Sequence, residues 1–281
     1  MTSALFDPAT HISAILEATS EFGHVIGQVN HPPNCKAARF SYLLADGPLP
    51  GEGLAAVVDF LSYHAGETQA VNLLAEVEEN SPTFEILRRC GFSAYGIASI
   101  WQLPAITEPQ PAMWKQPLPT DEIKMRTLYQ NVTPPLEQAA EPYQLNGGSY
   151  LAYRHNDEIA AWVRVHSGPL GTYLVPVVNP LASEPLSLLQ GLAGCGKNAN
   201  RPLYLQVRSH QSWLNTALEE MGARASAAYV LMTKHLAASQ KVGVESRVRQ
   251  GAEARQAKPT VPILHNLASD TPPTETKNGL K

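Results

Sequence analysis

Residues 71–92 read VNLLAEVEENSPTFEILRRCGF, and the fold can be deduced outward from this stretch. Its apolar run Val71–Val77 has the length of a buried strand. Ser81 and Pro82 then suit a helix N-cap and first helical position, because a serine oxygen accepts a hydrogen bond from a free helix N–H and proline needs no N–H there. The helix should end at Gly91, which is free to adopt a left-handed conformation. The stretch predicts a strand, a polar turn, a short helix and another strand.

A second copy of this pattern lies downstream. An apolar run precedes the amphipathic segment Trp213–Met221, which ends at Gly222. Setting Gly222 on Gly91 aligns Gln211 with Asn80. A repeat of this length predicts two copies of one domain rather than a solenoid.

This order of elements resembles the second half of a GNAT acyltransferase domain. In that family an asparagine at the end of a strand precedes a Gly-Phe pair by a helix of fixed length, and Asn80 and Gly91-Phe92 keep the spacing. The resemblance implies an α/β (α+β) fold with two tandem GNAT-like domains, each a mixed, mostly antiparallel sheet flanked by helices. The predicted boundaries are residues 1–104 for the first domain, 105–119 for a proline-rich linker, 120–237 for the second domain and 238–281 for a disordered tail.

Hydrophobic patterning predicts the other elements. A helix is expected over Pro8–Ser20, with Ile12, Ile15 and Leu16 on one face. Asp121 is expected to cap a helix that begins there. The remaining predictions are strands at 24–29, 38–44, 97–103, 150–153, 159–166, 171–178, 203–207 and 229–232, and helices at 54–64, 131–140 and 185–192.

Composition limits the function classes. The 281 residues are 44% hydrophobic with a formal net charge of −4, which argues against a dedicated nucleic-acid binder. The three cysteines are scattered without zinc spacing and indicate a reducing compartment. The N-terminus has no basic region typical of a signal peptide, and Asp59 interrupts the longest apolar helical segment. We therefore expect a cytoplasmic protein with no metal, nucleic-acid or membrane partner.

The resemblance also implies a cofactor site. GNAT domains bind the pyrophosphate of acetyl-CoA at a helix N-terminus, through a loop patterned Gln/Arg-x-x-Gly-x-Gly/Ala. The loop Pro48–Gly53, PLPGEG, keeps both glycines but has Pro48 at the lead position and a carboxylate, Glu52, where phosphates would lie. By this resemblance the acetyl-CoA contacts are Gly51, Glu52, Gly53, Leu54 and Asn80.

The catalytic pattern is incomplete. Many GNAT enzymes use a tyrosine of the helix before Gly-Phe to protonate the leaving thiolate, and here that position holds Leu87 and, in the second copy, Leu218. Glu76, Glu78 and Glu79, at the end of the strand, are the candidate general bases, with Glu76 or Glu79 preferred. The alternative interpretation is that these carboxylates are a solvated strand end near a helix N-terminus.

Two other patterns are interpreted as structural. Gly191–Asn198 nearly matches a phosphate-binding P-loop, but a predicted helix precedes it and a strand follows, which is the reverse of the required order. His166 and His210 are the most site-like histidines, and such residues are more often surface or hydrogen-bonded groups.

The sequence is compatible with two alternative functions. The first is an N-acetyltransferase that moves an acetyl group from acetyl-CoA to an unidentified small-molecule or peptide amine. The second is a catalytically inactive tandem module whose clefts bind another ligand or a protein partner. An open gap between two splayed strands would favour the enzyme, and a closed, filled gap would favour the module.

Overall fold

The computed structural model describes residues 11–16, 24–45, 51–105, 114–145, 148–155, 158–181, 184–195 and 201–236. The chain divides into the compact units Met1–Gln240 and Lys241–Lys281, and every described residue lies in the first. The tail predicted over 238–281 lies outside the described residues. We call residues 11–105 the first half and residues 114–236 the second half.

The first half contains five strands and two helices among its described residues. In chain order these are β1 (His11–Leu16), β2 (Val25–Asn30), β3 (Ala37–Ala45), α1 (Gly51–Glu67), β4 (Asn72–Glu78), α2 (Pro82–Arg89) and β5 (Ser93–Leu103).

The second half repeats the plan with more helices. Its described elements are β6 (Trp114–Lys115), η1 (Pro119–Asp121), α3 (Glu122–Val132), α4 (Pro135–Ala140), β7 (Ser149–His155), β8 (Glu158–Gly168), β9 (Gly171–Val178), α5 (Pro185–Gly194), β10 (Leu203–Arg208), η2 (Ser209–Leu214), α6 (Asn215–Glu220) and β11 (Arg224–His235).

The stretch from β4 to β5 folds as its sequence predicts. The Ser81 hydroxyl accepts a hydrogen bond from the Phe84 N–H at 3.2 Å, and Pro82 is the first residue of α2. Gly91 has a φ of 87°, and the Phe92 N–H donates to the Leu87 carbonyl at 3.0 Å, which closes the helix end.

The second copy ends in the same way. Gly222 has a φ of 75°, and the Ala223 N–H donates to the Leu218 carbonyl at 2.9 Å. The helix predicted over 213–221 is divided between the 3₁₀ helix η2 and the short α6. The repeat therefore preserves the chain path, although the local helix type differs.

Two local predictions are wrong. Residues His11–Leu16 form strand β1 instead of a helix, because they pair antiparallel with β2, from His11 opposite Asn30 to Leu16 opposite Val25. The Asp121 side chain does not cap α3. It accepts a hydrogen bond from the Leu118 N–H at 2.6 Å and pairs with Arg154, so it stabilises the preceding 3₁₀ turn.

The residues predicted as a linker, 105–119, include strand β6. Trp114 lies opposite Tyr153 of β7, and the Trp114 indole donates to the Leu188 carbonyl at 3.1 Å. Residues 106–113 lie outside the described part of the chain. The domain boundaries at 104, 119 and 237 stay predictions.

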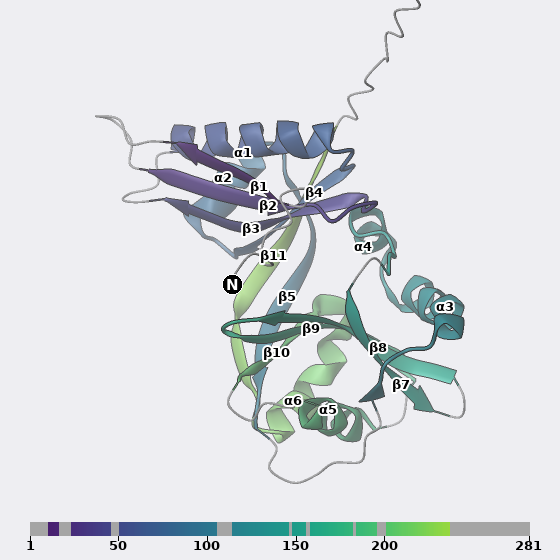
Figure 1. The fold of residues 1–281 in the computed structure, drawn as a ribbon. Coiled ribbons are helices and arrows are strands. Elements are labelled where there is room, and N and C mark those ends of the chain that lie inside the picture. Colours follow the sequence, from purple (N-terminus) through teal and green to yellow (C-terminus); the bar gives the residue numbers. More distant parts are fainter. Residues whose placement is uncertain are drawn as a thin grey trace, which may run out of the picture. The chain divides into compact units, whose positions relative to one another are not determined.

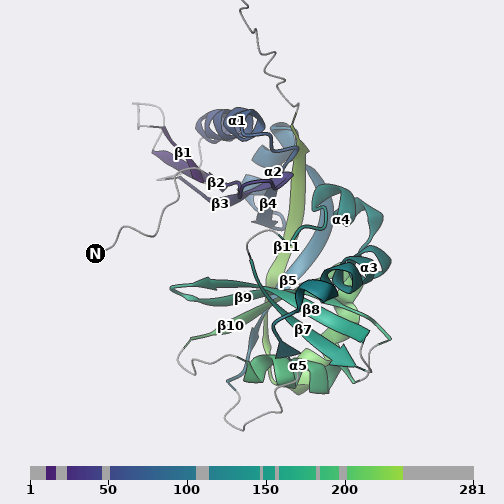
Figure 2. The ribbon, with the colours of Figure 1, turned by 45° about the vertical axis from the view of Figure 1, so that its right-hand side comes forward.

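The two halves share one sheet of 11 strands, in the order β1-β2-β3-β4-β11-β5-β10-β9-β8-β7-β6. Strand β11 lies between β4 and β5, antiparallel to both, and β5 in turn lies between β11 and β10. Figures 1 and 2 show β5 and β11 running side by side between the other strands of each half. The last strand of each half, β5 or β11, thus pairs with a strand of the other half.

Helices cover the sheet on both faces. Helix α1 packs on β1 and β2, and its buried Leu54, Val58 and Leu61 enter the core of the first half. In the second half α5 and α6 share one core with β10, whereas α3 packs its Met125 against β8 and β9 in another core (Figure 2). Among the described residues no helix has the length and apolar character needed to span a membrane.

Candidate functional site

Strands β3 and β4 separate part of the way along their length. They pair in parallel at only three positions, from Ala37 opposite Asn72 to Arg39 opposite Leu74. Strand β3 nevertheless continues to Ala45, and β4 continues to Glu78. Beyond Arg39 and Leu74 the two strands therefore no longer pair with each other.

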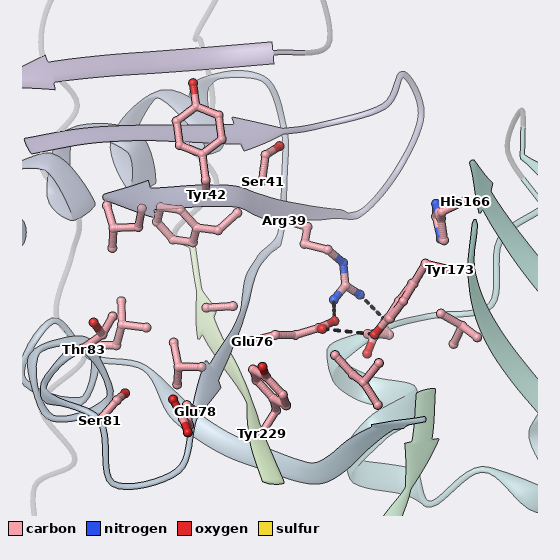
Figure 3. A pocket seen from close by; sticks show the side chains of 18 of the residues that line it. Arg39, Ser41, Tyr42, Glu76, Glu78, Ser81, Thr83, His166, Tyr173 and Tyr229 are labelled. Atoms are coloured by element: carbon pink, nitrogen blue, oxygen red, sulfur yellow. Dashed lines mark hydrogen bonds and ion pairs between the residues drawn. The ribbon is translucent and has the colours of Figure 1, made fainter. Parts of the chain in front are cut away.

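A cavity of about 610 Å³ lies along this gap (Figure 3). Strand β3, strand β4 and helix α2 supply most of one end, and residues of the second half supply the other. The lining residues are Arg39, Phe40, Ser41, Tyr42, Leu43, Ala75, Glu76, Val77, Glu78, Ser81, Thr83, Leu87, Ile100, Glu141, Arg164, His166, Tyr173, Val175 and Tyr229. The splayed strands thus enclose an open space rather than a packed core.

The second half supplies one wall of this cavity. His166 of β8 lies opposite Tyr173 of β9, and Arg164 lies opposite Val175, so all four residues occupy one face of the β8–β9 hairpin. In Figure 3, His166 and Tyr173 lie across the cavity from α2. Tyr229 enters from β11, the exchanged strand.

A network of charged groups closes the cavity where β3 and β4 meet. Arg39 pairs with Glu76 of β4, and its second nitrogen contacts Glu141 Oε2 at 2.5 Å. Arg208 of β10 contacts Glu141 Oε1 at 2.6 Å and Glu137 Oε2 at 2.7 Å. Because Glu141 accepts from both arginines, the network joins the two halves.

The network controls the protonation of its members. Burial alone would raise the pKa of the Glu141 carboxyl, but the charges of Arg208 and Arg39, with a hydrogen bond from Tyr95, hold that pKa well below its usual range. Burial, followed by the nearby charge of Glu76, raises the pKa of Tyr173 far above its usual value. Tyr173 therefore stays protonated and donates to Glu76 Oε2 at 3.4 Å.

His166 is held neutral at the edge of the cavity. Desolvation, followed by the positive charges of Arg164 and Arg39, lowers the pKa of His166 to about 4. The His166 side chain remains exposed to solvent at the rim of the cavity. At pH 7 the imidazole carries no charge.

The second half has an equivalent gap, which is bridged by a side chain. Strands β9 and β10 also pair at only three positions, ending with Leu174 opposite Leu205. Beyond that point the buried Gln211 donates to the Pro176 carbonyl of β9 at 3.0 Å. The Gln211 side chain thus supplies a hydrogen bond to the β9 backbone where β10 no longer pairs with it.

Of the predicted acetyl-CoA contacts and the carboxylates at the end of β4, the structure brings only Glu76 and Glu78 into the cavity. Glu76 lines it, whereas Glu79 is exposed in the following turn and donates its N–H to the Ala228 carbonyl. Gly51 and Glu52 are exposed at the start of α1, and Gly53 and Leu54 are buried in the same helix. Asn80 adopts a left-handed φ of 62° in the turn before α2. Pro48 lies outside the described residues.

Sequence reasoning missed four functional candidates: Arg39, Arg164, Tyr173 and Tyr229. Each lies on a strand, where the sequence shows only alternating apolar and polar residues. No neighbouring motif indicates that the residue belongs to a site. His166 was recognised as site-like, and it does line the cavity. Within the described residues no three His, Cys, Asp or Glu side chains are grouped to hold a metal ion.

No protein-family model and no curated protein matches this sequence. Solved structures do. A GCN5-related N-acetyltransferase from Kribbella flavida is similar with a TM-score of 0.50 at 10% identity, covering 79% of this chain and 89% of its own. A putative acetyltransferase from Pyrococcus horikoshii is similar with a TM-score of 0.50 at 13% identity, covering 84% of this chain and 77% of its own.

A tandem GNAT protein from the clavulanic acid biosynthesis pathway is also similar, with a TM-score of 0.42 at 14% identity, covering 81% of this chain and 84% of its own. The arrangement of helices and strands described above agrees with the fold of the two acetyltransferases at 0.50. The chain therefore has the GNAT acetyltransferase fold, in two tandem GNAT-like halves.

Proposed function

We propose that the chain transfers an acetyl group from acetyl-CoA to an amine in the cavity between β3 and β4. The observation that supports this most is the separation of these strands beyond Arg39 and Leu74, with an open cavity of about 610 Å³ along the gap. A module that had lost its cofactor would have no need to keep this gap open.

The residues along the gap fit acetyl-CoA in part. The edge of β3 from Phe40 onward offers backbone groups to an extended ligand, as an unpaired strand edge does. Helix α1 has 17 residues, and a Cβ added at Gly51, its first residue, would meet no atom of the described residues within 4 Å, so this helix N-terminus suits an anion. The Glu52 carboxylate in the first turn opposes that anion. Acetyl-CoA, when bound, would supply the acetyl group as an activated thioester.

Glu76 is the candidate base, because it lines the cavity and Glu79 does not; Glu78 also lines the cavity but is exposed at the end of β4. One of its carboxylate oxygens pairs with Arg39, and among the described residues the other accepts only the long hydrogen bond from Tyr173. This second oxygen can therefore accept a hydrogen bond from an amine. Arg39 and Tyr173 hold the carboxylate in place. This arrangement suits both orienting an amine and removing its proton.

Tyr229 is the candidate proton donor for the leaving thiolate. It lines the same cavity as Leu87, which occupies the position where the related enzymes have their tyrosine. Figure 3 shows the Tyr229 ring pointing into the cavity, and no described residue forms a hydrogen bond with its hydroxyl. We infer that the exchanged strand β11 supplies the phenol that α2 lacks.

For the gap between β9 and β10 in the second half, we favour the alternative that it has no catalytic role. Gln211 bridges to β9 in the second gap, and the buried Arg208 beside it is committed to Glu137 and Glu141. We therefore propose one catalytic site, in which the second half serves as a wall.

Isothermal titration of acetyl-CoA into the full chain tests the proposal. We expect Glu52→Gln to tighten binding roughly two- to fivefold, because it removes a negative charge from the first turn of α1. Glu184→Gln is the matched control, since Glu184 precedes α5 in the second half. Absence of binding to every variant, or an equal effect of both substitutions, would refute the proposed site.

A further inference from the structure

We propose that the amine acceptor also carries a carboxylate, and that Arg164 binds it. This assignment rests on the proposed function for the reaction, but the binding site can be tested without acetyl-CoA. It defines the substrate class as a small molecule of the amino-acid type rather than a polyamine or an uncharged amine.

The cavity at the gap continues into the second half. A second cavity of about 280 Å³ shares Arg39, Ser41, Glu141, Arg164 and His166 with the first. Its other walls include aromatic residues of the second half, such as Tyr143 and Trp162. An acceptor that reaches the gap through this space must pass Arg164.

Arg164 differs from the other two arginines that line the cavities. Arg39 and Arg208 each contact two carboxylates. Arg164 contacts no carboxylate among the described residues: one of its nitrogens donates to the Gln144 carbonyl at 3.1 Å, and its guanidinium lies 5.8 Å from the centre of the Tyr150 ring.

The Arg164 guanidinium also has an unused donor. Among the described residues its Nε is buried and has no hydrogen-bond partner, a feature that the Nε of Arg208 shares. Leaving a donor on a charged group unpaired in the interior costs free energy, unless a ligand completes the set. A planar guanidinium that is held at one nitrogen and stacked on a ring is well placed to bind a carboxylate with its remaining donors.

The surrounding charges favour a carboxylate over a phosphate. Glu76 and Glu78 line the first cavity together with Arg164, so a dianion would meet repulsion that a monoanion meets to a smaller degree. Glu76 lines the first cavity together with Arg164 and is the group that would receive the amine. A molecule with an amine and a carboxylate therefore has a matching group for each in this cavity.

The test measures binding of the twenty common L-amino acids and their primary amides to the full chain without acetyl-CoA, by ligand-observed NMR. We expect at least one free acid to bind at least tenfold more tightly than its amide. Arg164→Gln should remove that preference, and Arg164→Lys should keep part of it, because lysine keeps the charge but loses the planar fork.

Arg126→Gln is the matched control, because Arg126 also stacks on a tyrosine, at 5.5 Å from the centre of the Tyr143 ring, but lines neither cavity. This variant should keep the wild-type preference. Equal binding of acids and amides to the wild type, or no binding of either, would overturn the inference. Acetyl-CoA titration reports separately on the proposed function.

Discussion

Arg39 Nη2 lies 2.5 Å from Glu141 Oε2, although the two residues belong to different halves of the chain. Glu141 also accepts from Arg208, so one carboxylate holds a guanidinium from each half. This contact places the second half against the end of the cavity where β3 and β4 meet. It explains how residues so distant in the sequence come to line one cavity.

Glu141→Gln should destabilise the fold by about 3 kcal/mol, because it leaves two guanidinium groups without their shared counter-charge in a largely buried site. Urea denaturation measures the free energy of unfolding. Glu122→Gln removes the partner of Arg126 in an exposed pair and should cost less than about 1 kcal/mol. Equal losses in the two variants would show that the network does not hold the halves together.

Tyr229→Phe should lower kcat about a hundredfold with any accepted amine and leave the affinity for acetyl-CoA unchanged, because only the proton donor is removed. Tyr42→Phe provides the comparison. Tyr42 also lines the cavity, but Figure 3 shows its side chain pointing away from Glu76. A kcat that Tyr229→Phe does not change would exclude Tyr229 as the donor.

Stability should fall as the pH is lowered from about 6.5 towards 4, in part through His166. The unfolded imidazole has a pKa of about 6.5, and the folded one has a pKa of about 4. Between these values the unfolded chain binds the additional proton, so acid favours unfolding. This contribution is complete above about pH 6.5 and is lost as the pH falls.

Thermal melts of His166→Asn between pH 6.5 and 5 measure this effect. The variant should lose less stability over this range than the wild type. His155→Asn changes an exposed histidine that lines neither cavity, and should behave as the wild type does. A wild-type pH dependence in the His166 variant would contradict the assignment.

Removing β11 should unfold both halves. A chain that ends at Ala223 loses the seven residue pairs between β11 and β4, from Tyr229 with Glu78 to His235 with Asn72, as well as the pairing with β5. We expect far-UV circular dichroism to show loss of the sheet. A chain that ends at Gln240 retains β11 and should melt as the full chain does. A cooperative melt of the shorter chain would show that the first half is independent of β11.

Much of the fold could be predicted because its signals are local. Ser81, Pro82 and Gly91 act through caps and turns that involve only their neighbours, and the structure confirms each of them. Ile12 and Ile15 fit a helical spacing, so the local pattern predicts a helix, whereas the strand conformation of β1 depends on pairing with β2. Tertiary pairing overrides such a local pattern.

The cavity was less predictable because it depends on which strands become neighbours. The pattern of β11 indicates a strand, but it does not indicate that this strand enters between β4 and β5. Tyr229, Tyr173 and Arg164 therefore could not be assigned to the site. Glu76 could be assigned, because it lies near the end of β4 and its position follows from the local sequence. The acetyl-CoA contacts predicted at Gly51, Glu52, Gly53, Leu54 and Asn80 stay predictions.

Hydrogen–deuterium exchange with and without acetyl-CoA tests the central claim most directly. We predict that acetyl-CoA slows exchange of backbone amides in Phe40–Leu44 of β3, at the open edge of the gap, and leaves the equivalent edge Val175–Val178 of β9 unchanged. Slower exchange at β9 alone, or no change at either edge, would contradict an acetyl-CoA site in the first half.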